Sequence, residues 1–205
     1  MNIILQNIGK RFNTEWIFRG VNYRFDNGKK YAITGPNGSG KSTLLQIISG
    51  SSTHNEGKVD FLENQKTILP ENIYSKISLA APYIELIEEM TLREFLTFHG
   101  KMKGWIDGIS SSQMIEAVHL QTAIDKQIRH FSSGMKQRVK LAQAIFSSTS
   151  IVLLDEPLTN LDEEGILLYH TLINDYCKNR TVIVSSNDKK EYSFSDDILD
   201  IQDYK

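Results

Sequence analysis

The sequence predicts an α/β protein in which a sheet with flanking helices is interrupted once by a helical segment. Three observations lead to this prediction. The strand-like residues 31–34 precede a glycine-rich loop, and apolar residues at helical spacing follow it. From Thr91 onward the apolar period is helical. A continuous apolar run at residues 151–154 then suits a strand covered on both faces, so strands enclose the helical segment.

The first part of the chain is predicted to be mostly strands. Period-two apolar patterns and turn residues between them support this assignment. Asp26-Asn27-Gly28 is the expected turn into the strand that feeds the glycine-rich loop. The expected strands are residues 2–8, 16–25, 31–34, 58–62 and 77–81.

The middle of the chain is predicted to be helical, and the end returns to strands. Two or more helices separated by the loop 104–112 are marked by Leu92, Phe95, Leu96 and Phe98, and then by Met114, Val118 and Leu120. Another helix opens at Gly134 and carries Val139, Leu141, Ala142, Ile145 and Phe146. A helix at residues 163–176 and strands at 181–185 and 198–201 complete the expected order.

The glycine-rich loop has the composition of a phosphate-binding loop. It reads Gly35-Pro36-Asn37-Gly38-Ser39-Gly40-Lys41-Ser42, and Thr43 continues into the helix. The three glycines let backbone amides turn inward at a helix N-terminus, which makes a concave anion site. Lys41 is expected to reach the outer phosphates, and the Ser42 hydroxyl to ligate a bridging Mg²⁺. An ordinary glycine-rich turn would not need the strand before the loop or the helix after it.

A pair of carboxylates follows the apolar strand at residues 151–154. Asp155 and Glu156 stand at its carboxyl end, where open α/β sheets hold their ligands. We expect Asp155 to hold Mg²⁺ together with Ser42, and Glu156 to polarise the water that attacks the terminal phosphate. The alternative is a solvated strand end, which an acidic pair usually marks.

Composition limits the size and the partners of the protein. The chain has 205 residues with 40% hydrophobic content, which suits a single module. Acidic residues number 25 against 23 basic ones, and no basic stripe is present, so nucleic acid is not expected as a main partner. No apolar run approaches the length that crosses a bilayer, so any membrane connection is expected to come through another chain.

With these motifs the chain resembles the nucleotide-binding subunits of ABC transporters over essentially its whole length. The peptide Phe131-Ser132-Ser133-Gly134-Met135 stands where the family has its Leu-Ser-Gly-Gly-Gln signature, and residues 136–142 match as well. Ser132 offers a hydroxyl and Gly134 an unobstructed amide at a helix N-terminus, which suits a γ-phosphate. A simple helix cap by Ser132 is the alternative.

The resemblance implies a more specific fold. It is a P-loop NTPase fold of the ABC ATPase type, with a RecA-like mixed sheet core, an antiparallel β subdomain and an inserted helical subdomain. Residues 1–205 would then form a single ABC ATPase domain. Residues 1–82 and 149–205 would form its nucleotide-binding core, and residues 83–148 the helical subdomain that carries the signature peptide.

The resemblance also implies the activity and the partners. Two copies would dimerise head to tail on ATP and Mg²⁺, hydrolyse ATP and drive a separate transmembrane permease subunit from the cytoplasmic face of the inner membrane. Residues 158–162 resemble the D-loop at the dimer interface, which places Asp162 near nucleotide. Phe12 occupies the position of an aromatic ring that stacks on adenine. A core role for Phe12, and stacking by Trp16 instead, are the alternatives.

Two family residues are replaced. The family has a Gln after the strand at residues 77–81, where this chain has Pro82, which lacks a polar side-chain atom and an amide hydrogen. Tyr83 offers a hydroxyl with a different reach. Asn187 stands where the family usually has a His that contacts the γ-phosphate, and it cannot carry a proton or a charge. We therefore expect slow or partner-dependent hydrolysis.

Two other functions remain open at this stage. The missing Gln and His fit an ATP-gated binding or scaffold module with negligible turnover, and a soluble ABC ATPase outside transport is a further alternative. Residues 82–91 are the expected docking surface for a permease, through the apolar side chains of Tyr83, Ile84, Leu86 and Ile87. Ordinary core packing is the alternative for this segment.

Overall fold

The computed structural model describes all residues 1–205, and the chain divides into two compact units. The first unit comprises Met1–Leu79, Ser150–Asp155 and Asn179–Lys205, and the second comprises Ala80–Thr149 and Glu156–Lys178. These boundaries lie close to the predicted ones near residues 82 and 149. They differ in that Glu156–Lys178 belongs to the second unit, whereas the sequence prediction assigned it to the nucleotide-binding core. The division into functional domains stays a prediction.

An antiparallel sheet forms one part of the first unit. Its strands are β1 (Asn2–Phe12), β2 (Glu15–Phe25), β4 (Glu56–Glu63) and β5 (Lys66–Thr67), in the order β2-β1-β4-β5. Asn13 has a φ of 54°, which fits the tight turn that joins β1 to β2. Along β1 the pairing register shifts between Leu5 and Arg11, so the strand runs on past the region where its apolar alternation ends.

The second sheet of this unit is built from parallel pairs. Its strands are β3 (Lys30–Thr34), β6 (Ile77–Ala80), β7 (Ile151–Asp155), β8 (Thr181–Ser185) and β9 (Asp197–Asp200), in the order β6-β7-β8-β3-β9. Every residue of β7 and β8 is buried, as expected for central strands that are covered on both faces. The carboxyl ends of β3, β8 and β7 therefore lie at the same edge of the sheet.

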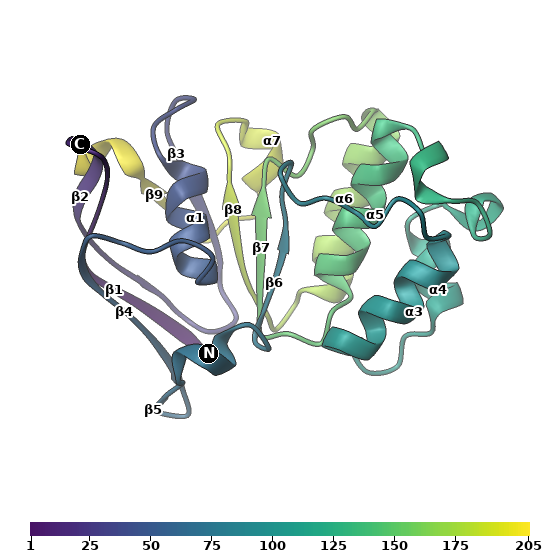
Figure 1. Ribbon diagram of the computed structural model, residues 1–205, viewed down its shortest axis with the longest axis horizontal. Coiled ribbons are helices and arrows are strands. Elements are labelled where there is room, and N and C mark those ends of the chain that lie inside the picture. The colour runs from purple at the N-terminus through teal and green to yellow at the C-terminus, as the bar shows by residue number, and fades with distance from the viewer. The chain divides into compact units, whose positions relative to one another are not determined.

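Helix α1 (Lys41–Ser49) lies between the two sheets (Figure 1). Its apolar side chains share one core with Ile3 of β1, Leu153 of β7 and Ile183 of β8. Burying both sheets against one helix fixes the position of the helix N-terminus, which follows the glycine-rich loop directly. The short helices of this unit are α2 (Pro70–Ile73), α7 (Lys189–Tyr192) and the 3₁₀ turn Ile201–Tyr204.

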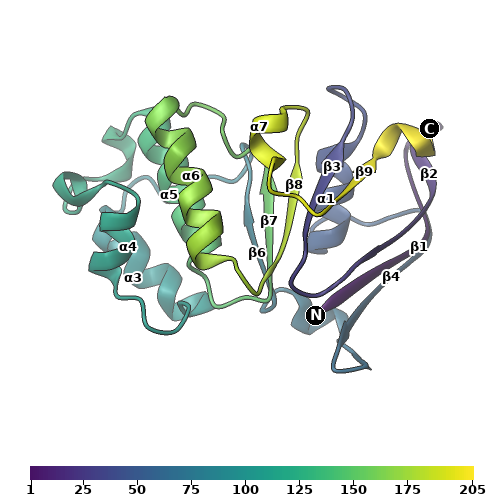
Figure 2. The same cartoon turned by 180° about the vertical axis from the view of Figure 1, so that it is seen from behind.

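The second unit is helical (Figure 2). Capping boxes at Thr91 and Ser110 start its first two helices, and a ring contact of 4.7 Å joins Phe146 to Tyr176. Its helices are α3 (Leu92–Lys103), α4 (Ser111–Ala117), α5 (Ser133–Ile145) and α6 (Glu163–Tyr176), with 3₁₀ turns at Gln121–Ala123 and Ile128–His130. Phe98 was expected to belong to the apolar pattern of the first helix, but its side chain is exposed.

The predicted fold class is confirmed by this arrangement. A parallel core, an antiparallel β subdomain and a helical insertion are all present. None of the helices is long and apolar enough to cross a membrane.

Candidate functional site

The phosphate-binding loop joins β3 to α1, and Gly40 in this loop occupies a position where a side chain would clash. Gly40 is the N-cap of α1 with a φ of 103°, in the left-handed region. A Cβ at Gly40 would lie 2.6 Å from Cγ2 of Ile17 and 3.0 Å from Cδ1 of Phe18, both on β2. Only glycine combines this backbone conformation with this close approach, so the loop can follow the path that turns its amides inward.

No side chain caps the N-terminus of α1. The first-turn amides, from Lys41 through Thr43, therefore lack the partner that most helices receive from a Ser, Thr or Asp. Unsatisfied amides and the positive end of the helix dipole favour an anion at this position.

Lys41 is the strongest sign that the loop is built for an anion. Its side chain is only 5% exposed, and Nζ donates to the carbonyl oxygens of Gly35 at 2.8 Å and of Pro36 at 3.1 Å. It makes no ion pair, so a buried cation faces neutral acceptors alone. Oγ of Ser39 in the same loop is buried without a hydrogen-bond partner. Both groups would gain from a phosphate, so the residues present fit the triphosphate of ATP.

The predicted metal ligand Asp155 lies at the carboxyl edge of the parallel sheet. Asp155 ends β7, is 2% exposed and pairs in register with Ser185 of β8, which in turn pairs with Ile33 of β3. Two strand spacings, about 10 Å, therefore separate Asp155 from the strand that enters the phosphate loop. The Ser185 Oγ between them is buried without a hydrogen-bond partner. A carboxylate and hydroxyls at this edge suit a hard cation such as Mg²⁺.

Asn187 lies against the phosphate loop. Its Nδ2 donates to Oδ1 of Asn37 at 3.1 Å. An amide at this position can hydrogen-bond a phosphate oxygen but supplies no charge.

Glu156 is the first residue of the second segment of the second unit, and its backbone is left-handed, with a φ of 44°. Such a conformation is uncommon for a residue with a Cβ. A turn follows, in which the Thr159 amide donates to the Glu156 carbonyl at 3.2 Å, and Asn160 also has a positive φ, of 65°. Strain of this kind concentrates at functional sites, which fits the predicted role of Glu156 as the base.

The signature peptide forms the start of α5. Ser132 is the N-cap, and its Oγ accepts from the Met135 amide at 3.2 Å. The helix-cap alternative is therefore realised in the structure, and an exposed hydroxyl that caps a helix can also meet a phosphate. A Cβ at Gly134 would lie 3.0 Å from the Asn160 carbonyl oxygen, so glycine permits the D-loop segment to approach the helix closely.

Asp162 caps α6, since its Oδ1 accepts from the Gly165 amide at 2.8 Å. Nη2 of Arg138 lies 3.5 Å from the same oxygen, which links the D-loop to α5. Nδ1 of His119 lies 2.9 Å from Oε1 of Glu164. A pocket of about 440 Å³ is lined by residues that include His119, Ser132, Gly134, Arg138 and Asp162. Arg138 and His119 were not foreseen from the sequence, because each pairs with a residue more than twenty positions away.

Phe12 and Trp16 differ in the number of cationic side chains that lie over their rings. Phe12 is 53% exposed, and its ring has the Lys10 ammonium 5.0 Å from its centroid. The guanidinium carbons of Arg19 and Arg11 lie 4.6 Å and 5.6 Å from the Trp16 ring centroid. Phe12 therefore has more free aromatic surface, which favours it over Trp16 for adenine stacking. Its exposure also argues against a core role.

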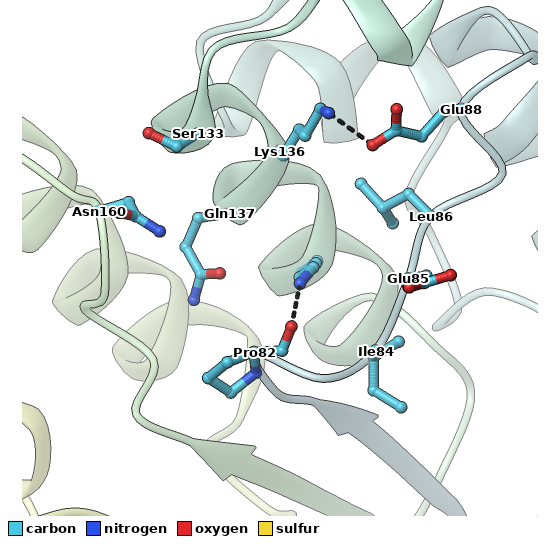
Figure 3. A pocket seen from close by; sticks show the side chains of 10 residues that line it. Pro82, Ile84, Glu85, Leu86, Glu88, Ser133, Lys136, Gln137 and Asn160 are labelled. Carbon is cyan, nitrogen blue, oxygen red and sulfur yellow. Dashed lines mark hydrogen bonds and ion pairs between the residues drawn. The ribbon is translucent and has the colours of Figure 1, made fainter.

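A second pocket in the helical unit, of about 350 Å³, lies between α5 and the segment that follows β6 (Figure 3). Of the apolar residues expected there as a docking surface, Tyr83 and Ile87 are exposed, whereas Leu86 is buried. The segment thus exposes two apolar side chains, while Leu86 packs into the core. Nζ of Lys136 lies 2.5 Å from Oε1 of Glu88 across this pocket.

The family model described as ABC transporter matches residues 18–159, which include the phosphate loop, the signature peptide and both carboxylates. The chain belongs to the ABC transporter family. This cassette is 32% identical over 192 residues to the uncharacterized ABC transporter ATP-binding protein YybJ of Bacillus subtilis, covering 90% of the cassette and 85% of YybJ. It is 30% identical over 195 residues to the cytochrome c biogenesis ATP-binding export protein CcmA of Reclinomonas americana, covering 90% and 84%.

Solved structures support the fold of the cassette. The dimeric structure of the ATP-binding cassette MJ0796 bound to ADP and Pi superposes with a TM-score of 0.82 at 23% identity, covering 97% of this chain and 94% of that chain. Other relatives are longer: the cassette spans 61–65% of three further Bacillus subtilis proteins. The cassette is thus an ABC-type ATPase that binds ATP.

Proposed function

We propose that this cassette is the ATP-hydrolysing subunit of an ABC transporter, which dimerises head to tail on ATP and Mg²⁺ to drive a separate transmembrane permease. The observation that carries the proposal is the buried ammonium of Lys41, which has only carbonyl partners inside a complete phosphate loop. A triphosphate supplies the negative charge that this group lacks.

Two helix N-termini of the chain support the proposed dimer. The phosphate loop offers amides and a cation, and the signature peptide offers Ser132 and Gly134 at a second helix N-terminus. A head-to-tail pair would join the loop of one copy to the signature peptide of the other, so two equivalent sites would form. The related cassette MJ0796 was solved as a dimer, which supports this arrangement. Asp162 caps α6 within the D-loop and would lie at the interface.

In the proposed reaction Glu156 accepts a proton from the attacking water, while Lys41 and Asn187 contact the terminal phosphate. Ser42 and Asp155 would hold Mg²⁺, which neutralises charge on the phosphate oxygens. Asn187 donates a neutral hydrogen bond where most of the family has a His, so less charge is stabilised as the phosphoryl group transfers. We therefore expect slow turnover, or turnover that rises when the permease binds.

The permease is proposed to dock on residues 82–91, whose exposed Tyr83 and Ile87 give an apolar surface beside the second pocket. This interaction would hold the cassette at the cytoplasmic face of the inner membrane. CcmA is named as an export protein, which favours export as the direction of transport.

A scaffold that closes on ATP without turnover is the second candidate, and Pro82 and Asn187 are the residues that favour it. Phosphate release by the wild-type chain and by Glu156→Gln separates the two. We expect the substitution to slow release by about 100-fold or more, because a positioned base contributes on that scale. Equal, measurable rates in a single-turnover experiment would remove Glu156 from the mechanism, whereas negligible release by both chains would leave the scaffold.

A further inference from the structure

Two lysines one turn apart on α5 reach toward the segment that follows β6. Nζ of Lys136 pairs with Glu88, as described above, and Nζ of Lys140 donates to the carbonyl oxygens of Ala81 at 3.3 Å and of Pro82 at 3.0 Å. In Figure 3 a dashed line ends on Pro82, and another joins Lys136 to Glu88. The segment is thus held to the helix that begins with the signature peptide.

The two ends of this segment are held in different ways. Backbone hydrogen bonds fasten its far end, since the amides of Ile128 and Arg129 donate to the carbonyls of Met90 and Glu88, both at 2.9 Å. At the near end, neither Ala81 nor Pro82 has a polar side chain and Pro82 has no amide hydrogen, so the Lys140 ammonium contacts the segment through the two carbonyl oxygens. A long side chain with several donors, such as Lys140, suits these two acceptors.

The contact partly removes the Lys140 ammonium from water. Burial lowers the pKa of Lys140, the Glu85 carboxylate acts in the opposite direction, and Lys136 lowers that pKa further. The ammonium meets neutral carbonyls and makes no ion pair, so a methionine of similar length loses only these hydrogen bonds and is expected to change the stability of the fold little. The contact is therefore expected to matter because it fixes the position of the segment on α5, and not because it stabilises the fold.

We propose that Lys140 is a positioning residue that ties the near end of the docking segment, residues 82–91, to α5, so that displacement of this segment by a partner reaches Ser132 and Gly134 at the other end of the helix. The proposal rests on the proposed function, because it assigns the docking role to residues 82–91. Lys140 would also compensate for the absence of the family's Gln at position 82, because its side chain on the helix bonds the backbone carbonyl of Pro82.

The test uses the full chain with Lys140→Met and Lys140→Arg, and with Lys101→Met, at an exposed position of α3, as the matched control. Amide hydrogen exchange is followed in residues 83–87 and in α1. We expect Lys140→Met to raise exchange in residues 83–87 by about tenfold, while α1 exchanges as before and the melting temperature does not fall. Lys140→Arg restores protection, and Lys101→Met changes nothing.

A second arm measures ATP–Mg²⁺-dependent dimerisation in the Glu156→Gln background. There Lys140→Met should weaken association by about threefold or more, and Lys140→Arg should restore it. Unchanged exchange in residues 83–87, or an arginine variant that behaves like the methionine variant, would overturn the proposal. If Glu156→Gln alone stays monomeric, the proposed function fails, and the exchange arm still decides the role of Lys140.

Discussion

The N-termini of α1 and α5 both lie within a short peptide that contains Gly and Ser, yet they differ in how their amides are satisfied. α1 starts at Gly40, which has no side chain to cap it, and carries a buried lysine without an anionic partner. α5 starts at Ser132, whose hydroxyl already accepts from the Met135 amide. The first helix end requires an anion for full satisfaction, whereas the second is stable without one.

This difference suggests an order of events. The phosphate loop binds the triphosphate first, because its amides and Lys41 gain most from it. The signature peptide needs no anion to satisfy its Met135 amide, so it binds a phosphate only when a second chain presents one. Nucleotide would then shift the population from separate chains to closed dimers, since only the closed form offers it both helix ends.

The largest effect is expected at the first helix end. Lys41→Met removes the cation, and the affinity for ATP–Mg²⁺ should fall by about tenfold to 100-fold, the range of a lost hydrogen bond to a charged group. Titration calorimetry measures this, with Lys30→Met as the control, because that lysine is on β3 outside the loop. An affinity within twofold of the wild type would contradict the assignment of the anion site.

An intermediate effect is expected at the second helix end. Asp is as good an N-cap as Ser, so Ser132→Asp should keep the melting temperature, but its charge repels a phosphate. The variant should bind ATP normally as a monomer and lose ATP-driven dimerisation. Ser132→Ala, by comparison, should lose about 1 kcal/mol of stability with the cap. Sedimentation and thermal melts measure both properties, and a Ser132→Asp variant that dimerises like its parent would remove the signature peptide from the nucleotide site.

The smallest effect is expected away from both helix ends, at the adenine. Phe12→Ala should weaken ATP binding by about fivefold, which corresponds to about 1 kcal/mol for one aromatic contact. Trp16→Ala is the matched control, because its ring already contacts two guanidinium groups, and it should change affinity much less. Fluorescence titration with ATP measures both variants, and the reverse ranking would assign stacking to Trp16.

The sequence predicted the elements that carry a strong local pattern. β8 and α6 have the expected bounds, and β7 differs by one residue, because continuous apolar runs and helical periods are visible within one segment. β1 was predicted to end at Ile8 but runs to Phe12, since its register shifts interrupt the alternation. The short α2 and β5 were not foreseen, because so few residues give no period.

In the candidate site, too, features within one segment could be predicted and contacts between distant segments could not. Its contiguous motifs, from the phosphate loop to the Asp155-Glu156 pair, could be identified by residue type and spacing. Contacts between distant residues could not, because they depend on packing. Examples are the bond from Lys140 to the Pro82 carbonyl and the pairing of His119 with Glu164.

The central claim is that nucleotide joins two copies of this chain through the two helix ends. Light scattering of the Glu156→Gln chain, with ATP and Mg²⁺ and then with ADP, tests it most directly. The account predicts a dimer with ATP and a monomer with ADP, and no dimer with ATP when Ser132→Asp is added. A monomer with ATP at high concentration, in the presence of its permease as well, would contradict it.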